Sequence, residues 1–321
     1  MPRPRGRIAA RAARAAMVIL KFAVYLLAAC FLVFCALDLL PGNAATQQLG
    51  FTGTTEQIQA LMHEWGLDLP LIERFASWLT GAASGDLGEV FATGRPVADA
   101  LIGPLSRTAA MFCLAFLAVA IAGTGLGVLA GLRSGRASDR AVSTGALIVR
   151  SMPEFVVALV LVLVFATCLK VLPAVSLAPV GASAFSAPEI FVLPTASIAL
   201  VGMSSVIRPV RAVVARENAE PYIEAARLAG VPERRVVLRH LLPSCAAPIA
   251  QALASVVPYL IGGAVIVECV FNFPGIGTLM VSAVQNREPN VLMACTLVMV
   301  SVSLVAYWLA DALLKEGEND A

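Results

Sequence analysis

Charged and titratable residues are scarce in this sequence. Only 14% of its 321 residues are charged and 59% are hydrophobic, whereas soluble globular domains are usually about 25% charged and about 45–50% apolar. The shortage is greatest among lysines and histidines, which number three and two: Lys21, Lys170, Lys315, His63 and His240.

The positions of these few residues exclude several kinds of enzyme. Every lysine follows a leucine, so the Gly-Lys-Ser/Thr sequence of a Walker A loop is missing and the chain has no ATP site of that type. Neither histidine belongs to an HExxH motif, which a zinc protease of the common type requires. Both histidines also lie outside the long apolar runs, which argues against an intramembrane Ser-His hydrolase. The sequence therefore predicts no catalytic residue, no metal site and no cofactor.

The cysteines follow no framework pattern. No two of them have CxxC spacing, and all fall in or beside apolar runs: Cys30, Cys35, Cys113, Cys168, Cys245, Cys269 and Cys295. We interpret them as small buried hydrophobic residues; a disulfide framework or a metal site is the alternative.

Long apolar runs make up most of the chain. Spanning a bilayer takes about 20 mostly apolar residues per helix, and six runs qualify: residues 15–40, 105–130, 155–172, 191–210, 246–271 and 291–314. Barrel strands would be about ten residues long with alternating polarity, so these continuous runs favour helices. The sequence predicts an all-α, multi-pass protein of the plasma (inner) membrane with six transmembrane helices. The first run is longer than a signal-peptide h-region, and we expect it to be retained rather than cleaved.

Arginines gather on one side of these predicted spans. Five precede the first run, four follow the second, and seven lie from Arg208, at the end of the fourth run, to Arg239, before the fifth. The positive-inside rule then places both termini in the cytoplasm and residues 41–104 outside. In that segment, Thr54 and Gln57 can form a capping box that begins a short helix. We divide the chain into residues 1–104 (N-terminus, first span and outside segment), 105–314 (transmembrane domain) and 315–321 (cytoplasmic tail).

Two features inside the spans have alternative interpretations. Gly123, Gly127 and Gly131 are four residues apart; no strand precedes them, so we interpret them as a helix-packing face rather than a nucleotide loop. Glu268 lies near the end of the fifth run, in VECVFNFPGIG. It is either a proton site or a helix-end carboxylate that bonds near a pore, and the second is favoured because no chain of such groups is visible. Pro274 and Gly275 belong with it as candidate pore or gate residues.

One dense charged segment, EPYIEAARLAGVPERRVVLRHLLP at residues 220–243, separates the fourth and fifth runs. We expect a short helix with Tyr222, Ile223 and Ala226 on one face, a stop at Gly230 in the left-handed conformation, and a second helix with Pro232 at its first position. From composition alone, an ordinary positive-inside loop is an equal alternative.

This segment resembles the coupling loop of ABC importer permeases, whose pattern is Glu-Ala-Ala, three residues, Gly, nine residues, Ile-x-Leu-Pro. Here it reads Glu224-Ala225-Ala226, Gly230 and Leu242-Pro243, with His240 at the Ile position. Five further stretches resemble the peptide/nickel class of these permeases: LDLLPGNAA (37–45), GLDLPLIERFASWL (66–79), GDLGEVFATGRPV (85–97), SMPEF (151–155) and VECVFNFPGIGTLMVSAVQNRE (267–288). The chain departs from that class in its final residues, KEGENDA, and in a short loop between the third and fourth spans.

The resemblance implies a type I ABC importer transmembrane fold that forms half of a translocation pathway for peptides, with nickel or another small solute as the alternative. It implies two separate ATPase subunits, a second similar permease and an extracytoplasmic solute-binding protein as partners, within a lipid bilayer and without nucleic acid. It places ATPase docking in the loop at about residues 216–243, on Tyr222, Glu224, Ala225, Ala226, Gly230, Leu242 and Pro243. A proton- or sodium-coupled secondary transporter and a pore-less membrane anchor are the competing classes.

Overall fold

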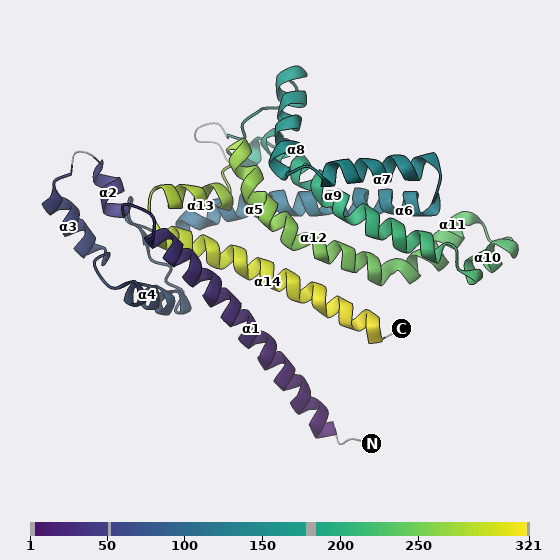
Figure 1. Cartoon of the computed structure of the whole chain (residues 1–321), viewed down its shortest axis with the longest axis horizontal. Helices are drawn as coiled ribbons and strands as arrows, with labels where there is room; N and C mark the ends of the chain where they lie inside the picture. The colour runs from purple at the N-terminus through teal and green to yellow at the C-terminus, as the bar shows by residue number, and fades with distance from the viewer. Residues whose placement is uncertain (1–3, 51–52, 178–183, 320–321) are drawn as a thin grey trace. The chain divides into compact units, whose positions relative to one another are not determined.

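The structure is a computed structural model and describes residues 4–50, 53–177 and 184–319, with side chains for residues 17–50, 53–177 and 185–309 (Figure 1). The predicted N-terminal arginines and Lys315 therefore have side chains outside this description. The described chain is almost entirely helical, with one short hairpin. Its α-helices are α1 (Pro4–Asp38), α2 (Ala44–Leu49), α3 (Thr55–Glu64), α4 (Leu71–Ala83), α5 (Val97–Ala118), α6 (Thr124–Leu132), α7 (Ala137–Arg150), α8 (Glu154–Leu161), α9 (Glu189–Glu217), α10 (Pro221–Leu228), α11 (Glu233–Val236), α12 (Leu242–Phe271), α13 (Ile276–Gln285) and α14 (Pro289–Asn319).

Shorter elements connect these helices. The π-helical segments η2 (Val119–Gly123), η3 (Val162–Cys168) and η5 (Val237–Leu241) each continue an α-helix, and η4 (Ala184–Ser186) is a 3₁₀ turn. Strands β1 (Glu89–Val90) and β2 (Arg95–Pro96) pair antiparallel, with Glu89 opposite Pro96.

Five described helices are long and apolar enough to cross a membrane, and there are six spans if the bent pair α7 and α8–η3 is one. The spans are Met17–Asp38, Val97–Leu132, Ala137–Cys168 with its bend, Glu189–Glu217, Glu233–Phe271 and Pro289–Leu309. The all-α, multi-pass architecture is thus as expected. The third span differs from the predicted run at residues 155–172, because it begins with a helix at residues 137–150. A bend of 107° separates it from residues 154–168.

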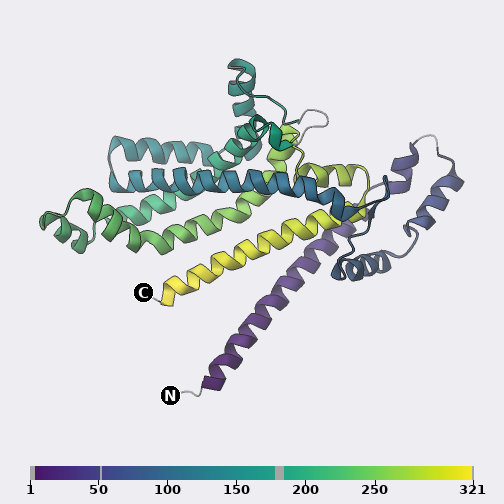
Figure 2. The same cartoon turned by 180° about the vertical axis from the view of Figure 1, so that it is seen from behind.

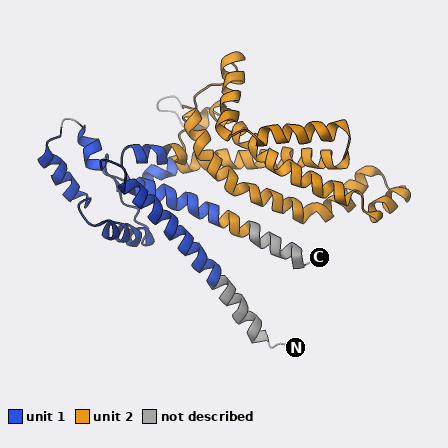
Figure 3. Ribbon diagram, viewed as in Figure 1, with its two compact units in different colours: residues 1–103, 279–304 blue, residues 104–278, 305–321 orange. Residues whose placement is uncertain are grey.

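The chain divides into two compact units, residues 1–103 with 279–304 and residues 104–278 with 305–321 (Figure 3). In the first unit, the core joins α1, α4 and α14 through Cys30, Phe34, Trp78 and Met293. Two helices of this unit begin with a full capping box, at Asn43 for α2 and at Thr54 for α3. The capping box predicted at Thr54 is confirmed. The Thr54 hydroxyl accepts from the backbone N–H of Gln57, and the Gln57 side chain accepts from the Thr54 N–H.

In the second unit, α9 is the central helix and packs against α6, α7, α8 and α12 (Figures 1 and 2). The contact with α6 depends on Gly127 and Gly131. A Cβ atom at Gly131 would lie 2.7 Å from Val214 Cβ and 2.9 Å from the Arg211 carbonyl oxygen, and one at Gly127 would lie 2.8 Å from Val210 Cβ. The predicted helix-packing role of these glycines is therefore confirmed.

The seven cysteines are all free thiols. Cys30, Cys245 and Cys295 are buried, as predicted, and Cys35 is partly so. The prediction is wrong for the other three, Cys113, Cys168 and Cys269, which are exposed. A lipid-facing surface is as apolar as a core, so hydropathy alone does not separate the two.

Candidate functional site

The charged segment between α9 and α12 folds as the short helix α10, a glycine turn and the single turn of α11. Ile223 is fully buried, in the same core as Val236 and Leu241 of the following turn, and Ala226 packs against that core. These apolar contacts hold α10 to the body of the second unit. An ordinary loop would have no such buried anchor.

Gly230 forms the turn that ends α10. Its φ of +77° lies in the left-handed region, which glycine adopts without the steric cost that a Cβ atom brings. The Gly230 N–H donates to the Arg227 carbonyl (2.9 Å) and the Val231 N–H to the Ala226 carbonyl (3.2 Å), which satisfies the last carbonyls of the helix. The predicted stop is confirmed. Pro232, however, is the N-cap of α11 rather than its first residue.

Arg227 ties both ends of this segment together. Its Nε and Nη2 donate to the two carboxylate oxygens of Glu233 at 3.0 and 2.8 Å, and Nη2 also donates to Asn218 Oδ1 at 2.6 Å. The bonds to Glu233 raise the pKa of Arg227. Asn218 caps the C-terminus of α9 and Glu233 begins α11, so one guanidinium connects three helices. The local sequence pattern does not indicate these partners, because it does not show where α9 ends.

Tyr222 has a different position from the one predicted. It is 44% exposed instead of lying on the buried face with Ile223. Its hydroxyl donates to Glu217 Oε1 at 2.6 Å and lies 3.1 Å from Ser244 Oγ. A phenol can reach polar partners at the ends of α9 and α12 that an aliphatic side chain would not, and this overrides the i, i+3 pattern. Tyr222 is therefore a second polar tie for α10.

The outward surface of α10 is small and mixed in character. Glu224 and Ala225 are exposed, and Leu228 is 83% exposed, a large fraction for an apolar side chain. Of the predicted residues at the start of α12, Leu242 is partly buried and Pro243 is exposed. The helix thus exposes a carboxylate, small side chains and one leucine, while its other face is fixed.

Glu268 is fully buried near the C-terminus of α12. Its Oε1 accepts from the Thr108 hydroxyl at 2.6 Å, and its Oε2 accepts from the Gly277 N–H at 2.6 Å. Thr108 Oγ1 in turn accepts from the Ile276 N–H at 2.9 Å. The carboxylate therefore anchors the turn at residues 272–278, which agrees with the favoured interpretation of a helix-end carboxylate.

The predicted partners of Glu268 lie in that turn. Asn272, in the left-handed conformation (φ 49°), ends α12, and Pro274 accepts from Arg107 Nε at 2.5 Å through its carbonyl. Gly275 faces the carboxylate so closely that any Cβ atom there would overlap it. The structure brings Glu268, Pro274 and Gly275 together within the second unit.

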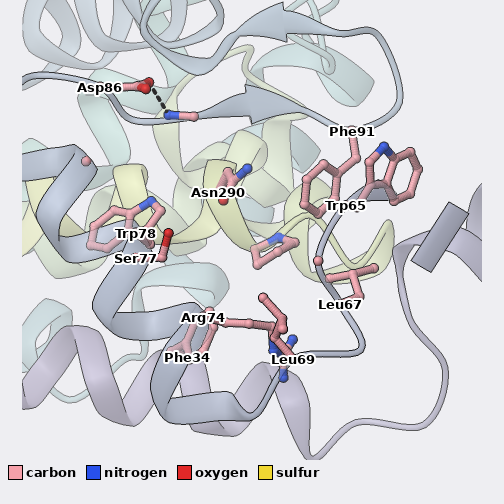
Figure 4. A pocket seen from close by; sticks show the side chains of 14 residues that line it. Phe34, Trp65, Leu67, Leu69, Arg74, Ser77, Trp78, Asp86, Phe91 and Asn290 are labelled. Carbon is pink, nitrogen blue, oxygen red and sulfur yellow. Dashed lines mark hydrogen bonds between the residues drawn. The ribbon is translucent and has the colours of Figure 1, made fainter. Parts of the chain in front are cut away.

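The first unit holds a pocket of about 300 Å³ beside α4 (Figure 4). The stacked rings of Trp65 and Phe91, 4.6 Å between centroids, line one side of it and Trp78 lies on the other. Trp78 Nε1 and Arg74 Nε are buried and have no hydrogen-bond partner among the described residues. Arg74 also pairs with Asp38 and lies over the Phe34 ring. Trp78 and Arg74 both line the pocket, next to its aromatic surface.

The hairpin beside this pocket is fixed by a residue distant in sequence. Glu288 accepts from the backbone N–H groups of Phe91 (2.9 Å) and Ala92 (2.8 Å), and the Asn290 side chain donates to the Glu89 carbonyl at 2.9 Å. These bonds hold the turn-rich stretch against the residues that lead into α14. Nothing in the local sequence near residues 89–96 indicates this partner.

The spans, the anchored surface helix and the buried end of α12 define a class of protein, a multi-pass membrane subunit of a transport system. Comparison with known proteins gives the family: residues 123–316 match the profile of the binding-protein-dependent transport system inner membrane component. The chain belongs to this family, and it is an ABC importer permease of the plasma (inner) membrane.

Several curated proteins are similar over most of their length. The chain is 30% identical over 269 residues to a probable peptide ABC transporter permease protein of Sinorhizobium fredii, covering 84% of this chain and 86% of the relative. It is 30% identical over 292 residues to a putative peptide permease protein of Brucella ovis, covering 89% and 91%. It is 31% identical over 263 residues to the glutathione transport system permease protein GsiC of Escherichia coli K12, covering 82% and 83%.

Proposed function

We propose that the chain forms half of the translocation pathway of an ATP-driven importer for peptides, and that α10 docks into a separate ATPase. The observation that carries this proposal is the construction of α10. Its inner face is buried through Ile223, its ends are tied by Arg227 and Tyr222, and Glu224, Ala225 and Leu228 are left free to meet a partner. A surface helix fixed in this way can pass a displacement to the spans.

The sequence has no Gly-Lys pair, so in this proposal the chain is a non-catalytic subunit. It obtains its energy from a separate partner that binds and hydrolyses ATP. Two ATPases that close on ATP would carry two such helices with them, one from this chain and one from a second, similar permease. Ala225 allows close approach, Glu224 supplies a charge for a basic partner residue, and Leu228 supplies apolar area.

The proposed substrate class rests on the relatives, two of which are named for peptides and one for glutathione, itself a tripeptide. In this proposal, an extracytoplasmic solute-binding protein delivers the peptide and docks on residues 41–104. Residues 105–314 form the transmembrane domain and 315–321 its tail. Glu268, Pro274 and Gly275 shape the gate of the pathway from the end of α12.

The test combines charge reversal, backbone change and a matched control. The chain is tagged and purified in mild detergent from cells that also express the cognate ATPase, second permease and binding protein. We expect Glu224→Arg to remove the ATPase from the complex while the second permease stays, because loss of one partner of a buried interface pair typically costs about 2–5 kcal/mol. Gly230→Pro fixes φ near about −65° and is expected to abolish peptide-stimulated ATP hydrolysis.

Arg136→Glu is the control, a charge reversal at an exposed residue of the α6–α7 turn, and should leave both readouts unchanged. If Glu224→Arg and Gly230→Pro retain the ATPase and hydrolyse ATP like the parent, α10 is an ordinary positive-inside connection and the coupling proposal is wrong.

A further inference from the structure

A cavity of about 620 Å³ lies between α7 and α9 in the second unit. It shares no lining residue with the segment at 216–243 or with the Glu268 turn. Four arginines line it, Arg140 and Arg150 from α7 and Arg208 and Arg211 from α9, together with the hydroxyl groups of Ser143, Thr144, Ser204 and Ser205. The sequence did not predict this cavity, because residues 137–150 lie outside the six apolar runs.

The cavity has one carboxylate, and that carboxylate is fully used. Asp139 accepts from Arg211 Nε at 2.6 Å and from Arg211 Nη2 at 2.7 Å. It also accepts from the Gly135 N–H (2.8 Å) and the Ser143 hydroxyl (3.1 Å). Both oxygens therefore have two donors each, and Asp139 cannot neutralise another arginine.

The other three arginines have no anionic partner. Arg140 donates only to the Gly135 carbonyl (3.3 Å) and Arg150 only to the Ser205 hydroxyl. Arg208 makes no hydrogen bond to any described residue, and none of the three forms an ion pair there. These three guanidinium groups gather on one exposed face of the unit, two of them on α7 and one on the membrane-length helix α9. Their convergence on one cavity points to an anion as its occupant.

The length of α9 places this cavity at the depth of lipid head groups. Twenty-nine residues extend about 44 Å at 1.5 Å per residue, which exceeds the hydrocarbon core by about 14 Å, or about nine residues. Arg208 lies nine residues before the end of α9 at Glu217, so with the excess length on the side of the arginine-rich α10 segment it lies at the boundary of the core. Arg150 bonds to Ser205, within one turn of Arg208, so its long side chain also extends toward that level.

We propose that this cavity binds the headgroup of an anionic phospholipid. The phosphate would accept charge-assisted hydrogen bonds from Arg208, Arg150 and Arg140, for which a guanidinium has the matching geometry. Leu147 and Ile148 of α7 are 50% and 54% exposed and provide apolar surface for acyl chains close to the arginines. A soluble anion would have no use for this apolar surface. The proposal does not depend on the transported substrate.

Lipid binding to the purified, delipidated transporter tests the proposal directly. Dioleoylphosphatidylglycerol and dioleoylphosphatidylcholine are added separately, and bound lipid per complex is counted by native mass spectrometry. We expect the phosphatidylglycerol to be retained in preference. Arg208→Gln should weaken its binding about five-fold, the ratio that corresponds to about 1 kcal/mol per basic residue near an anionic membrane. Arg208→Lys should retain most of it, which separates loss of charge from loss of fold.

Arg136→Gln is the matched control, because Arg136 is exposed one turn away from Arg140 but does not line the cavity. Equal binding of the two lipids, or an equal loss in Arg136→Gln and Arg208→Gln, would overturn the proposal. Displacement of phosphatidylglycerol by millimolar glutathione or inorganic phosphate would overturn it too, since the cavity would then be a site for soluble anions.

Discussion

Gly275 lies so close to the carboxylate of Glu268 that a Cβ atom at position 275 would overlap it. The carboxylate cannot move aside easily, because Thr108 and the Gly277 N–H hold its two oxygens. The turn after α12 therefore depends on a glycine and a glutamate that fit as a pair.

We predict that Gly275→Ala destabilises the chain by about 1–3 kcal/mol, the usual cost of forcing an extra group into a packed interior. The cost should be much smaller in a Glu268→Ala background, where the overlap is removed. Thermal unfolding in detergent, followed by tryptophan fluorescence, measures both. Gly262→Ala is the control, since a Cβ there meets nothing within 4 Å. Equal effects of Gly275→Ala with and without Glu268 would contradict the pairing.

A second prediction concerns the contact between α6 and α9. Gly131→Ala should lower the melting temperature by several degrees, because the new methyl group would press on Val214 and on the α9 backbone. Gly125→Ala in the same helix should be neutral or stabilising by up to about 1 kcal/mol, because its Cβ would be in open space and alanine favours a helix. The idea fails if the two variants melt alike.

The third prediction concerns pH. His63 Nδ1 lies 2.8 Å from Asp68 Oδ2 at the end of α3. The hydrogen bond and charge of Asp68 raise the pKa of His63, and the same bond lowers the pKa of Asp68. Because the folded-state pKa of His63 is raised and that of Asp68 is lowered, the pair stabilises this turn fully between about pH 3.9 and about pH 6.5, the ordinary aspartate and histidine values. That stabilisation is lost as the pH rises through the raised value.

Histidine NMR provides the measurement. In a His240→Asn background, His63 is the single histidine, so its titration midpoint is read without overlap. We expect a midpoint above about 6.5, which returns toward that value in Asp68→Asn. A midpoint that does not change between the two chains would show that the contact is absent in solution.

Local signals were sufficient for much of this architecture. The apolar runs give the spans because length and hydropathy are what the bilayer requires. Thr54 and Gln57 reveal the start of α3, and Gly230 the end of α10, because each motif is complete within four residues. The third span was the exception. Arg140 and Arg150 lie outside the predicted apolar runs. In the structure they lie on a helix whose polar face lines a cavity beside α9.

The side-chain ties of the candidate site were less accessible to sequence reasoning. The partners of Arg227 are Asn218 and Glu233, which belong to the ends of two other helices. Glu288 meets the backbone of Phe91 across 197 residues. Such contacts depend on tertiary packing, which no spacing rule along one helix contains. Tyr222 shows the same limit, because periodicity assigned it to the buried face and its hydroxyl found polar partners outside.

The glycine contact between α6 and α9 has a mechanical consequence. At Gly127 and Gly131 no side chain of α6 separates the two backbones. We therefore expect α6 and α9 to move as one rigid body. Tyr222 and Arg227 of α10 bond to Glu217 and Asn218 at the end of α9, so a displacement of the surface helix would pass to α6 and α9 together. A change of shape would then occur elsewhere, and we expect it at residues 151–153, between helices that diverge by 107°. Spin labels at Gly125 and Ala212 should therefore keep a constant separation between the states of the transport cycle. Labels on either side of residues 151–153 should change theirs.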